Sequence, residues 1–184
     1  MSAAPRRWAA ELLHFWFCRL RPHDWFRGGE HVDDALRRRF ERELLALSSR
    51  PASEFLRDPQ IARAAILLFD QLPRNLYRGT PRAFAFDPLA LSICHGALER
   101  GWDRGLGKAE RQFLAMPLQH SERIADQLRS LRYFTALEDS FVLRFARAHY
   151  RMIARFGRFP HRNEVLGRPS TPAEIAAVEA GNQW

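Results

Sequence analysis

Apolar residues recur at helical spacing along most of the chain. In the segment 139–156 five large apolar side chains fall within about 60° of one direction on a helical wheel, and they are Val142, Phe145, Met152, Ile153 and Phe156. Neither a long alternation of β-branched residues nor an Asn-Gly hairpin turn is present. The pattern predicts helices over 7–18, 31–47, 58–70, 88–99, 108–115, 121–137, 139–156 and 172–180.

Capping residues support several of these boundaries. A side chain that bears an oxygen is followed by proline at Asp58-Pro59, Asp87-Pro88 and Thr171-Pro172. Proline suits the first helical position because its missing N–H would lack a partner there, while the preceding side chain caps the next amides. Glu174 would complete a capping box with Thr171. Glycine, which favours a left-handed helix end, follows the helical pattern at Gly101, Gly157 and Gly181.

The short connections between the predicted helices indicate an all-α fold. We expect seven to eight antiparallel helices in a single bundle, forming one domain over residues 1–184. A chain of 184 residues is long enough to bury a sizeable core. No repeat period is visible, so the residues themselves do not predict a solenoid.

Composition narrows the class of protein. The two cysteines, Cys18 and Cys94, lie far apart and predict no disulfide framework. The longest apolar run, residues 64–69, is too short for a membrane span, and Glu11 and His14 interrupt the apolar core that a signal peptide needs. We therefore expect a cytoplasmic protein that does not bind membranes. No phosphate loop, dinucleotide fingerprint or metal-ligand spacing is present, so we predict no cofactor and no metal.

The formal net charge of +8 is of the sign that nucleic-acid-binding proteins carry. Almost all of the positive charge is arginine, with Lys108 the only lysine, and the arginines are spread along the chain instead of being massed in one tail. Such a bias often reflects codon composition. Nucleic acid is therefore a minor alternative as a partner, behind a small molecule or a protein.

His149 stands in the middle of the apolar stripe of segment 139–156. One interpretation is a core histidine that is hydrogen-bonded to a neighbouring carbonyl or hydroxyl group. The other is a residue that transfers protons, because the pKa of histidine lies near neutrality. The sequence leaves both open.

Asp70 ends the most apolar predicted helix, where a carboxylate opposes the helix dipole and calls for a cation. Arg74 and Arg78 follow it, and Arg158 and Arg162 follow the segment 139–156. If the two arginine-bearing segments meet in space, Asp70 would organise several guanidinium groups for contact with a phosphate or carboxylate. The alternative is a static network in which the arginines cap helix ends and pair with Asp70 and Asp87.

A third group of polar residues lies in MPLQHSE, residues 116–122. Pro117 is predicted to end one helix, and Ser121 to cap the next, with Glu122 in its first turn. Those roles leave His120 unexplained, so His120 is a candidate functional residue.

Three segments also carry a family resemblance: ILLFDQLPRNLYRGTPRAFAFDPLA at 66–90, FLAMPLQHSE at 113–122 and RFGRFPHRNEVLGRPSTPAE at 155–174. With FWF at 15–17 and DWF at 24–26, they resemble, in order, the signature of the bacterial domain-of-unknown-function 924 family. The resemblance implies a fold similar to tetratricopeptide-like helical proteins and implies no activity. Its signature falls on polar positions, which here are Asp70, Gln71, Arg74, Asn75, Arg78, Asp87, His120, Ser121, Glu122, His149, Arg158, His161, Arg162 and Asn163.

The leading hypothesis is a polar pocket that binds an anionic small molecule in the manner of a hydrolase or transferase. Its candidate catalytic residues are His149, His120 and Asp70. Its candidate substrate-binding residues are Gln71, Arg74, Asn75, Arg78, Arg158, His161, Arg162 and Asn163. The second hypothesis is a protein- or peptide-binding module with an exposed aromatic strip, for which the candidates are Trp16, Trp25 and Phe26.

Overall fold

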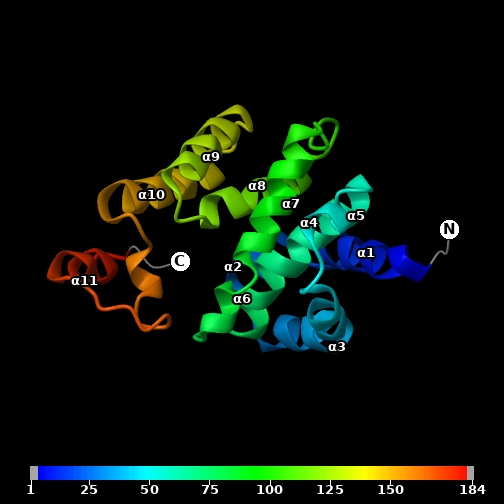
Figure 1. Cartoon of the computed structure of the whole chain (residues 1–184), viewed down its shortest axis with the longest axis horizontal. Helices are drawn as coiled ribbons and strands as arrows, with labels where there is room; N and C mark the ends of the chain where they lie inside the picture. The colour runs from blue at the N-terminus through cyan, green and yellow to red at the C-terminus, as the bar shows by residue number, and fades with distance from the viewer. Residues whose placement is uncertain (1–3, 182–184) are drawn as a thin grey trace. The chain divides into compact units, whose positions relative to one another are not determined.

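The computed structural model describes residues 4–181, without the side chains of residues 4–6 and 27. All regular secondary structure in this range is helical, which confirms the all-α prediction. Figure 1 shows the helices in chain order. They form two compact units: unit 1 comprises Met1–Arg78 and Arg82–Pro117, and unit 2 comprises Gly79–Pro81 and Leu118–Trp184. The single domain expected from the sequence stays a prediction.

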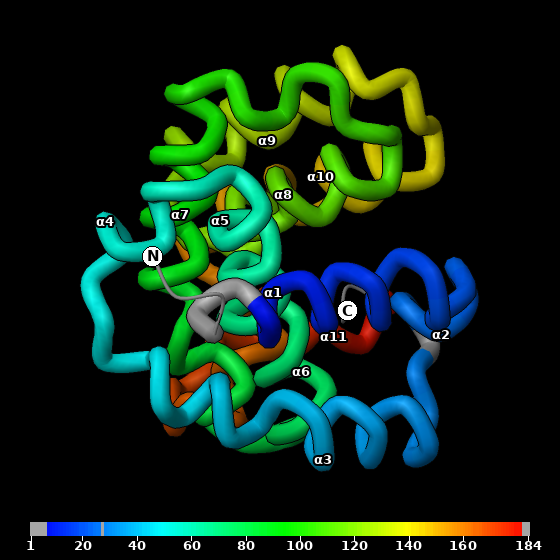
Figure 2. Tube along the Cα trace, turned by 90° about the vertical axis from the view of Figure 1, so that its right-hand side faces the viewer, coloured from blue at the N-terminus to red at the C-terminus, as the bar shows by residue number. Residues whose placement is uncertain are grey.

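Unit 1 contains seven complete helices and most of an eighth within the described residues. Their bounds are α1 (Ala4–His14), α2 (Pro22–Arg27), α3 (Glu30–Leu47), α4 (Ala52–Phe55), α5 (Pro59–Ile66), α6 (Leu72–Leu76), α7 (Asp87–Glu99) and α8 (Lys108–His120), of which residues 108–117 belong to this unit. Two π-helical turns, Phe15–Arg19 and Leu67–Gln71, and a 3-10 turn, Pro81–Phe84, complete the series. Helix α5 packs against both α1 and α7 (Figure 2).

The chain from Pro59 to Leu76 is helical throughout and supplies the most deeply buried part of unit 1. Asp58 caps its start by accepting hydrogen bonds from the amides of Gln60 and Ile61, as predicted. The expectation that Asp70 ends this helix is wrong. Asp70 lies in the π-turn, where the amide of Leu72 bonds to the carbonyl of Leu67, five residues back. Pro73 cannot donate a helical hydrogen bond, and the wider turn lets the helix continue into α6.

Unit 2 is built around an antiparallel helix pair. Helices α9 (Ile124–Ala136) and α10 (Ser140–Phe156) are joined by a short turn and pack side by side (Figure 1). A 3-10 turn (Pro160–Arg162) and α11 (Pro172–Glu179) follow. Two predicted caps are confirmed. Gly157 ends α10 in the left-handed conformation, with φ of 71°, and Thr171 forms the capping box with Glu174.

Pro117 does not end α8, which was predicted to stop at residue 115. The helix continues to His120 with Pro117 inside it. A proline within a helix costs about 3 kcal/mol. Phe113, Leu114 and Leu118 are buried on the same helix, and each contributes about 1.5–3 kcal/mol, which outweighs that cost.

Two further capping predictions are wrong. Helix α9 begins after Arg123, which has no side-chain cap, so Ser121 and Glu122 lie outside the helix. The hydroxyl of Ser121 donates instead to Asp126 and accepts from the amide of Arg123. Helix α7 begins at Asp87 itself, whose carboxylate pairs with an arginine and does not cap the helix. In residues 4–181, no helix has both the length and the apolar character required to cross a membrane.

Candidate functional site

In unit 1 the spacing of four residues between Asp70 and Arg74 brings their polar groups together on one side of the helix. Arg74 donates to both carboxylate oxygens of Asp87 at 2.7 and 2.8 Å and to the backbone carbonyl of Asp70 at 2.6 Å. The fully buried carboxylate of Asp70 lies 3.6 Å from the same guanidinium. Burial acts to lower the pKa of Arg74, but the charges of Asp70 and Asp87 raise it overall. Arg74 thus joins Asp70 and Asp87 in one internal network.

The other candidate residues of unit 1 are also engaged in internal contacts. Gln71 donates to Asp70 at 2.5 Å. Asn75 and Arg78 both bind Asp33, at 2.8 Å and 3.1 Å, and tie the end of α6 to the start of α3. Arg78 keeps half of its side chain exposed. These pairs connect helices, and the role of Arg74, Asn75 and Arg78 in binding an anion stays a prediction.

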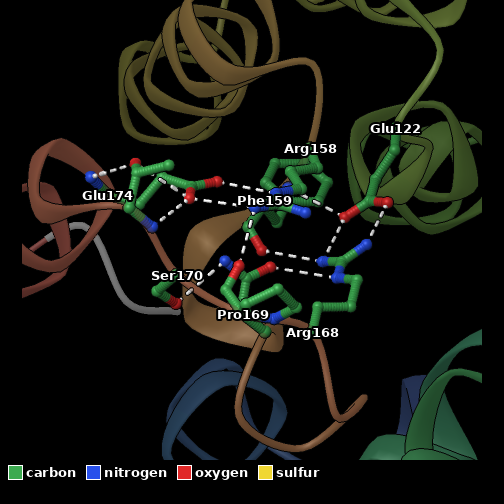
Figure 3. A network of polar contacts seen from close by, with 9 residues as sticks. Glu122, Arg158, Phe159, Arg168, Pro169, Ser170 and Glu174 are labelled. Carbon is green, nitrogen blue, oxygen red and sulfur yellow. Dashed lines mark hydrogen bonds and ion pairs between the residues drawn. The ribbon is translucent and has the colours of Figure 1, made fainter.

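In unit 2, Arg158 anchors α11 to the segment after α10 (Figure 3). It donates to the two carboxylate oxygens of Glu174 at 2.7 and 3.0 Å and to the carbonyl of Pro169. Glu174 also accepts from the amide and hydroxyl of Thr171. The hydrogen bonds from Arg158 and Thr171 hold the pKa of Glu174 well below its usual range. Arg158 therefore links α11 to the segment after α10, and its role in binding an anion stays a prediction.

Glu122 and Arg168 hold the backbone of Phe159 from both sides (Figure 3). Glu122 accepts from the amide of Phe159 at 2.8 Å and from Arg168 at 2.8 and 3.0 Å. Arg168 also donates to the carbonyl of Phe159 and to Asn163, whose amide donates to Ser170. Burial acts to raise the pKa of Glu122, but the hydrogen bonds from Arg168 and Phe159 lower it overall. Arg168 was not among the predicted residues, because its partner Glu122 lies 46 positions away in the chain.

Basic side chains gather around the aromatic ring of Phe159, whose backbone is held by Glu122 and Arg168. Phe159 is fully buried and packs with Met152 and Ile153. The guanidinium of Arg162 lies 4.5 Å from the Phe159 ring centre, and the rings of His149 and His161 lie at 5.3 and 5.5 Å. The ring of His120 lies 6.3 Å from that of His149. We call His120, His149, Phe159, His161 and Arg162 the Phe159 cluster; all five belong to unit 2.

His149 is the most deeply buried histidine of the cluster, with 5% of its surface exposed. Its Nδ1 lies 2.8 Å from the carbonyl oxygen of Phe145. A carbonyl only accepts, so Nδ1 carries the proton and the neutral ring has its lone pair on Nε2. Burial, together with the positive charges of His120, Arg162 and His161, lowers the pKa of His149 well below 6.5. His149 is therefore neutral at pH 7, in the protonation state of a general base.

This lowered pKa predicts a pH dependence of stability. Above pH 6.5, His149 is neutral in both the folded and the unfolded protein and adds no pH dependence. Below pH 6.5 the unfolded chain takes up a proton that the folded chain refuses, so the free energy of unfolding falls by up to about 1.4 kcal/mol per pH unit. Urea unfolding at pH 7.5, 6.5 and 5.5 measures this slope. The slope should be smaller in the variant His149→Gln, because this variant lacks the titrating imidazole. Identical slopes in the two proteins would contradict the assignment.

The structure brings some of the predicted site residues together. His120, His149, His161 and Arg162 meet in unit 2, and Asp70, Gln71 and Arg74 meet in unit 1. The predicted convergence of the Asp70–Arg78 and Arg158–Asn163 segments stays a prediction, since the two segments belong to different units. Across the described part of the chain, no three His, Cys, Asp or Glu side chains form a group that would hold a metal ion.

The aromatic strip expected of a peptide-binding module is only partly present. Trp16 is buried, with 1% of its surface exposed, so its assignment to an exposed strip is wrong. Its ring packs edge-on against Phe113, which makes it a core residue. Trp25 is half-buried and donates to the backbone carbonyl of Trp16. Phe26 is 48% exposed and stacks on Phe113.

Comparisons with known proteins place the chain in a family. A search of curated proteins finds no match. The chain is similar to a protein of unknown function from Agrobacterium tumefaciens, with 35% identity over 94% of this chain and 97% of that one, and a TM-score of 0.88. The family model described as bacterial protein of unknown function (DUF924) matches residues 12–182. The chain therefore belongs to the bacterial DUF924 family.

Proposed function

We propose that the Phe159 cluster binds an anionic small molecule through a phosphate or carboxylate group. The observation that carries this proposal is the convergence of two histidines and one arginine on the buried Phe159 ring, with the ring of His120 beside that of His149. The planar guanidinium of Arg162 is suited to bidentate contact with either group, and imidazole N–H groups add further donors. An anion at this position would also relieve the repulsion among the basic groups that lowers the pKa of His149.

The same cluster supplies the elements of proton transfer. A neutral imidazole whose Nδ1 is held by a carbonyl has a basic Nε2 in a fixed orientation. In a hydrolase or transferase, His149 would accept the proton of an attacking water or hydroxyl group, while Arg162 and His161 hold the anion. Binding without chemistry remains the alternative, in which the cluster is a receptor for the same class of ligand.

Thermal unfolding with added ligands tests the proposal. The panel contains inorganic phosphate, phosphate monoesters without a nucleobase, and mono- and dicarboxylates. A compound that binds the native state at about 100 times its Kd should stabilise it by about 2.7 kcal/mol and raise Tm.

Two histidine variants make the test specific. The variant His161→Gln should lose most of the rise in Tm. The matched control His23→Gln replaces a histidine that is 67% exposed in unit 1 and should retain it. If no compound raises the Tm of the wild-type protein, or if both variants respond alike, the Phe159 cluster is not an anion site.

The protein-binding hypothesis is weaker on structural grounds. Of its three candidate residues, only Phe26 exposes much of its surface. A single exposed ring is normal for a folded protein and does not form an interaction strip.

A further inference from the structure

The outer face of α10 carries a straight row of arginines. Arg144, Arg147, Arg151 and Arg155 follow one another at intervals of three, four and four residues, and all four are exposed. At about 100° per residue this spacing keeps them within about 80° of one direction, and a rise of about 1.5 Å per residue makes the row about 16 Å long. We call these four residues the α10 arginine row.

The positive charge of this row is not balanced locally. Helix α10, from Ser140 to Phe156, contains no acidic residue. Within the part of the chain that the structure describes, none of the four arginines forms an ion pair. Two of the four contact aromatic rings: the guanidinium of Arg144 lies 5.5 Å from the ring centres of Phe141 and Phe145. Arg155 lies 4.8 Å from that of Phe156. The row differs in this respect from Arg74, Arg158 and Arg168, which all pair with carboxylates.

The packing and the caps of α10 hold the four arginines of the row at fixed positions. The opposite face of α10 is buried through Val142, Ala146, His149, Met152 and Ile153. The helix is capped at its start by the carboxylate of Asp139 and at its end by Gly157. The arginines therefore keep their mutual spacing, and they lie on the side of the helix away from the Phe159 cluster.

We propose that the α10 arginine row binds the phosphate backbone of nucleic acid without sequence preference. Each strand of a duplex carries a phosphate about every 3.4 Å along its axis, so the row spans roughly five phosphates. Guanidinium groups contact phosphate oxygens in a bidentate manner, and the net charge of +8 favours the approach of a polyanion. Because arginines are spread evenly along the sequence, the row is recognised only once residues 140–156 form a single helix.

Other polyanionic surfaces fit the row less well. Binding in an anionic membrane surface requires large apolar side chains exposed beside the basic ones. On α10 the exposed large apolar side chain is Phe141, in the first turn and not between the arginines. An acidic protein would have to present carboxylates at matching intervals, whereas the phosphates of nucleic acid repeat regularly.

Fluorescence anisotropy tests the proposal by measuring the affinity of the full chain for labelled nucleic acids. The probes are 20-nucleotide single strands and 20-base-pair duplexes, each in DNA and RNA form. Four phosphate contacts predict a slope of log K against log salt of about −3 for single strands and about −3.6 for a duplex. The affinity for a duplex should therefore fall by about 100-fold between 50 and 200 mM salt.

A charge-matched pair of variants separates the row from the net charge. The row variant replaces Arg144, Arg147, Arg151 and Arg155 with glutamine. The control variant replaces four exposed arginines of unit 1 with glutamine, namely Arg38, Arg42, Arg57 and Arg104. We expect at least a tenfold loss of affinity and a slope close to zero for the row variant, and a smaller change for the control. Circular dichroism checks that both variants are folded.

Three results would overturn the proposal. They are the absence of binding by the wild-type protein at 50 mM salt, equal losses in the two variants, and row-dependent binding to vesicles containing phosphatidylserine without binding to nucleic acid. The last result would assign the row to a membrane surface.

Discussion

Replacing Arg74 with methionine should lower the free energy of unfolding by about 3–5 kcal/mol. The guanidinium of Arg74 pairs with Asp87 and lies 3.6 Å from the carboxylate of Asp70, which is fully buried. Methionine has a similar length but no charge, so the variant leaves a buried carboxylate without this cation. Removing one partner of a buried ion pair costs more than the pair itself contributes. Urea unfolding followed by circular dichroism measures the loss.

Arg78→Met is the matched control for Arg74→Met. Arg78 lies four residues along the same segment and also contacts an aspartate, Asp33, but 54% of its side chain is exposed. An exposed ion pair contributes about 0–1 kcal/mol, so this variant should change the free energy of unfolding by no more than that. Similar losses in the two variants would show that burial of Asp70 is not the source of the effect.

Replacing Phe159 with alanine should destabilise the protein by about 3–5 kcal/mol. The ring is fully buried, and it contacts Met152 and Ile153 as well as the basic groups of the Phe159 cluster. Its removal leaves a cavity beside His149 and Arg162, which the surrounding backbone cannot fill because Glu122 and Arg168 hold it in place. Urea unfolding measures the loss, and the variant should also lose any ligand-induced rise in Tm.

Phe141→Ala provides the comparison for Phe159→Ala. Phe141 lies at the start of α10 and is 44% exposed. Surface substitutions of this kind usually change stability by less than about 0.5 kcal/mol, although loss of the contact with Arg144 adds slightly to the change. A loss for Phe159→Ala as small as that for Phe141→Ala would mean that unit 2 does not depend on the Phe159 ring.

Several helix ends were predictable from local signals, although two of the expected caps are absent. Asp58, Thr171 with Glu174, and Gly157 act on amides and carbonyls within one turn of themselves, and all behave as the sequence indicates. The predictions failed at Pro117, where local propensity opposed burial, and at Asp70, where a π-turn carries the helix onward. The short helices α2, α4 and α6 were missed because four to six residues carry too little periodicity.

The residues of the candidate site were also only partly predictable from the sequence. Sequence reasoning selected His149 from its place on an apolar stripe, His120 because capping does not explain it, and Arg162 because it follows the long helix. His161 was added by the family resemblance. Sequence reasoning also selected Arg158 but did not foresee its pairing with Glu174. It also passed over Arg168, the residue that holds the backbone of Phe159. The partner of an arginine depends on which segments meet, and the spacing of residues along the chain does not contain that information.

By itself the sequence determined the helical class and the caps at Asp58, Thr171 and Gly157, because hydrogen bonds within one turn and the period of a helix depend only on near neighbours. Tertiary structure alone decided which carboxylate each guanidinium meets, as with Glu122 and Arg168 across 46 positions. It also decided that His149 is buried against the Phe145 carbonyl and neutral. Charge and protonation depend on desolvation and on distances of a few ångströms, and these quantities exist only once the chain has folded.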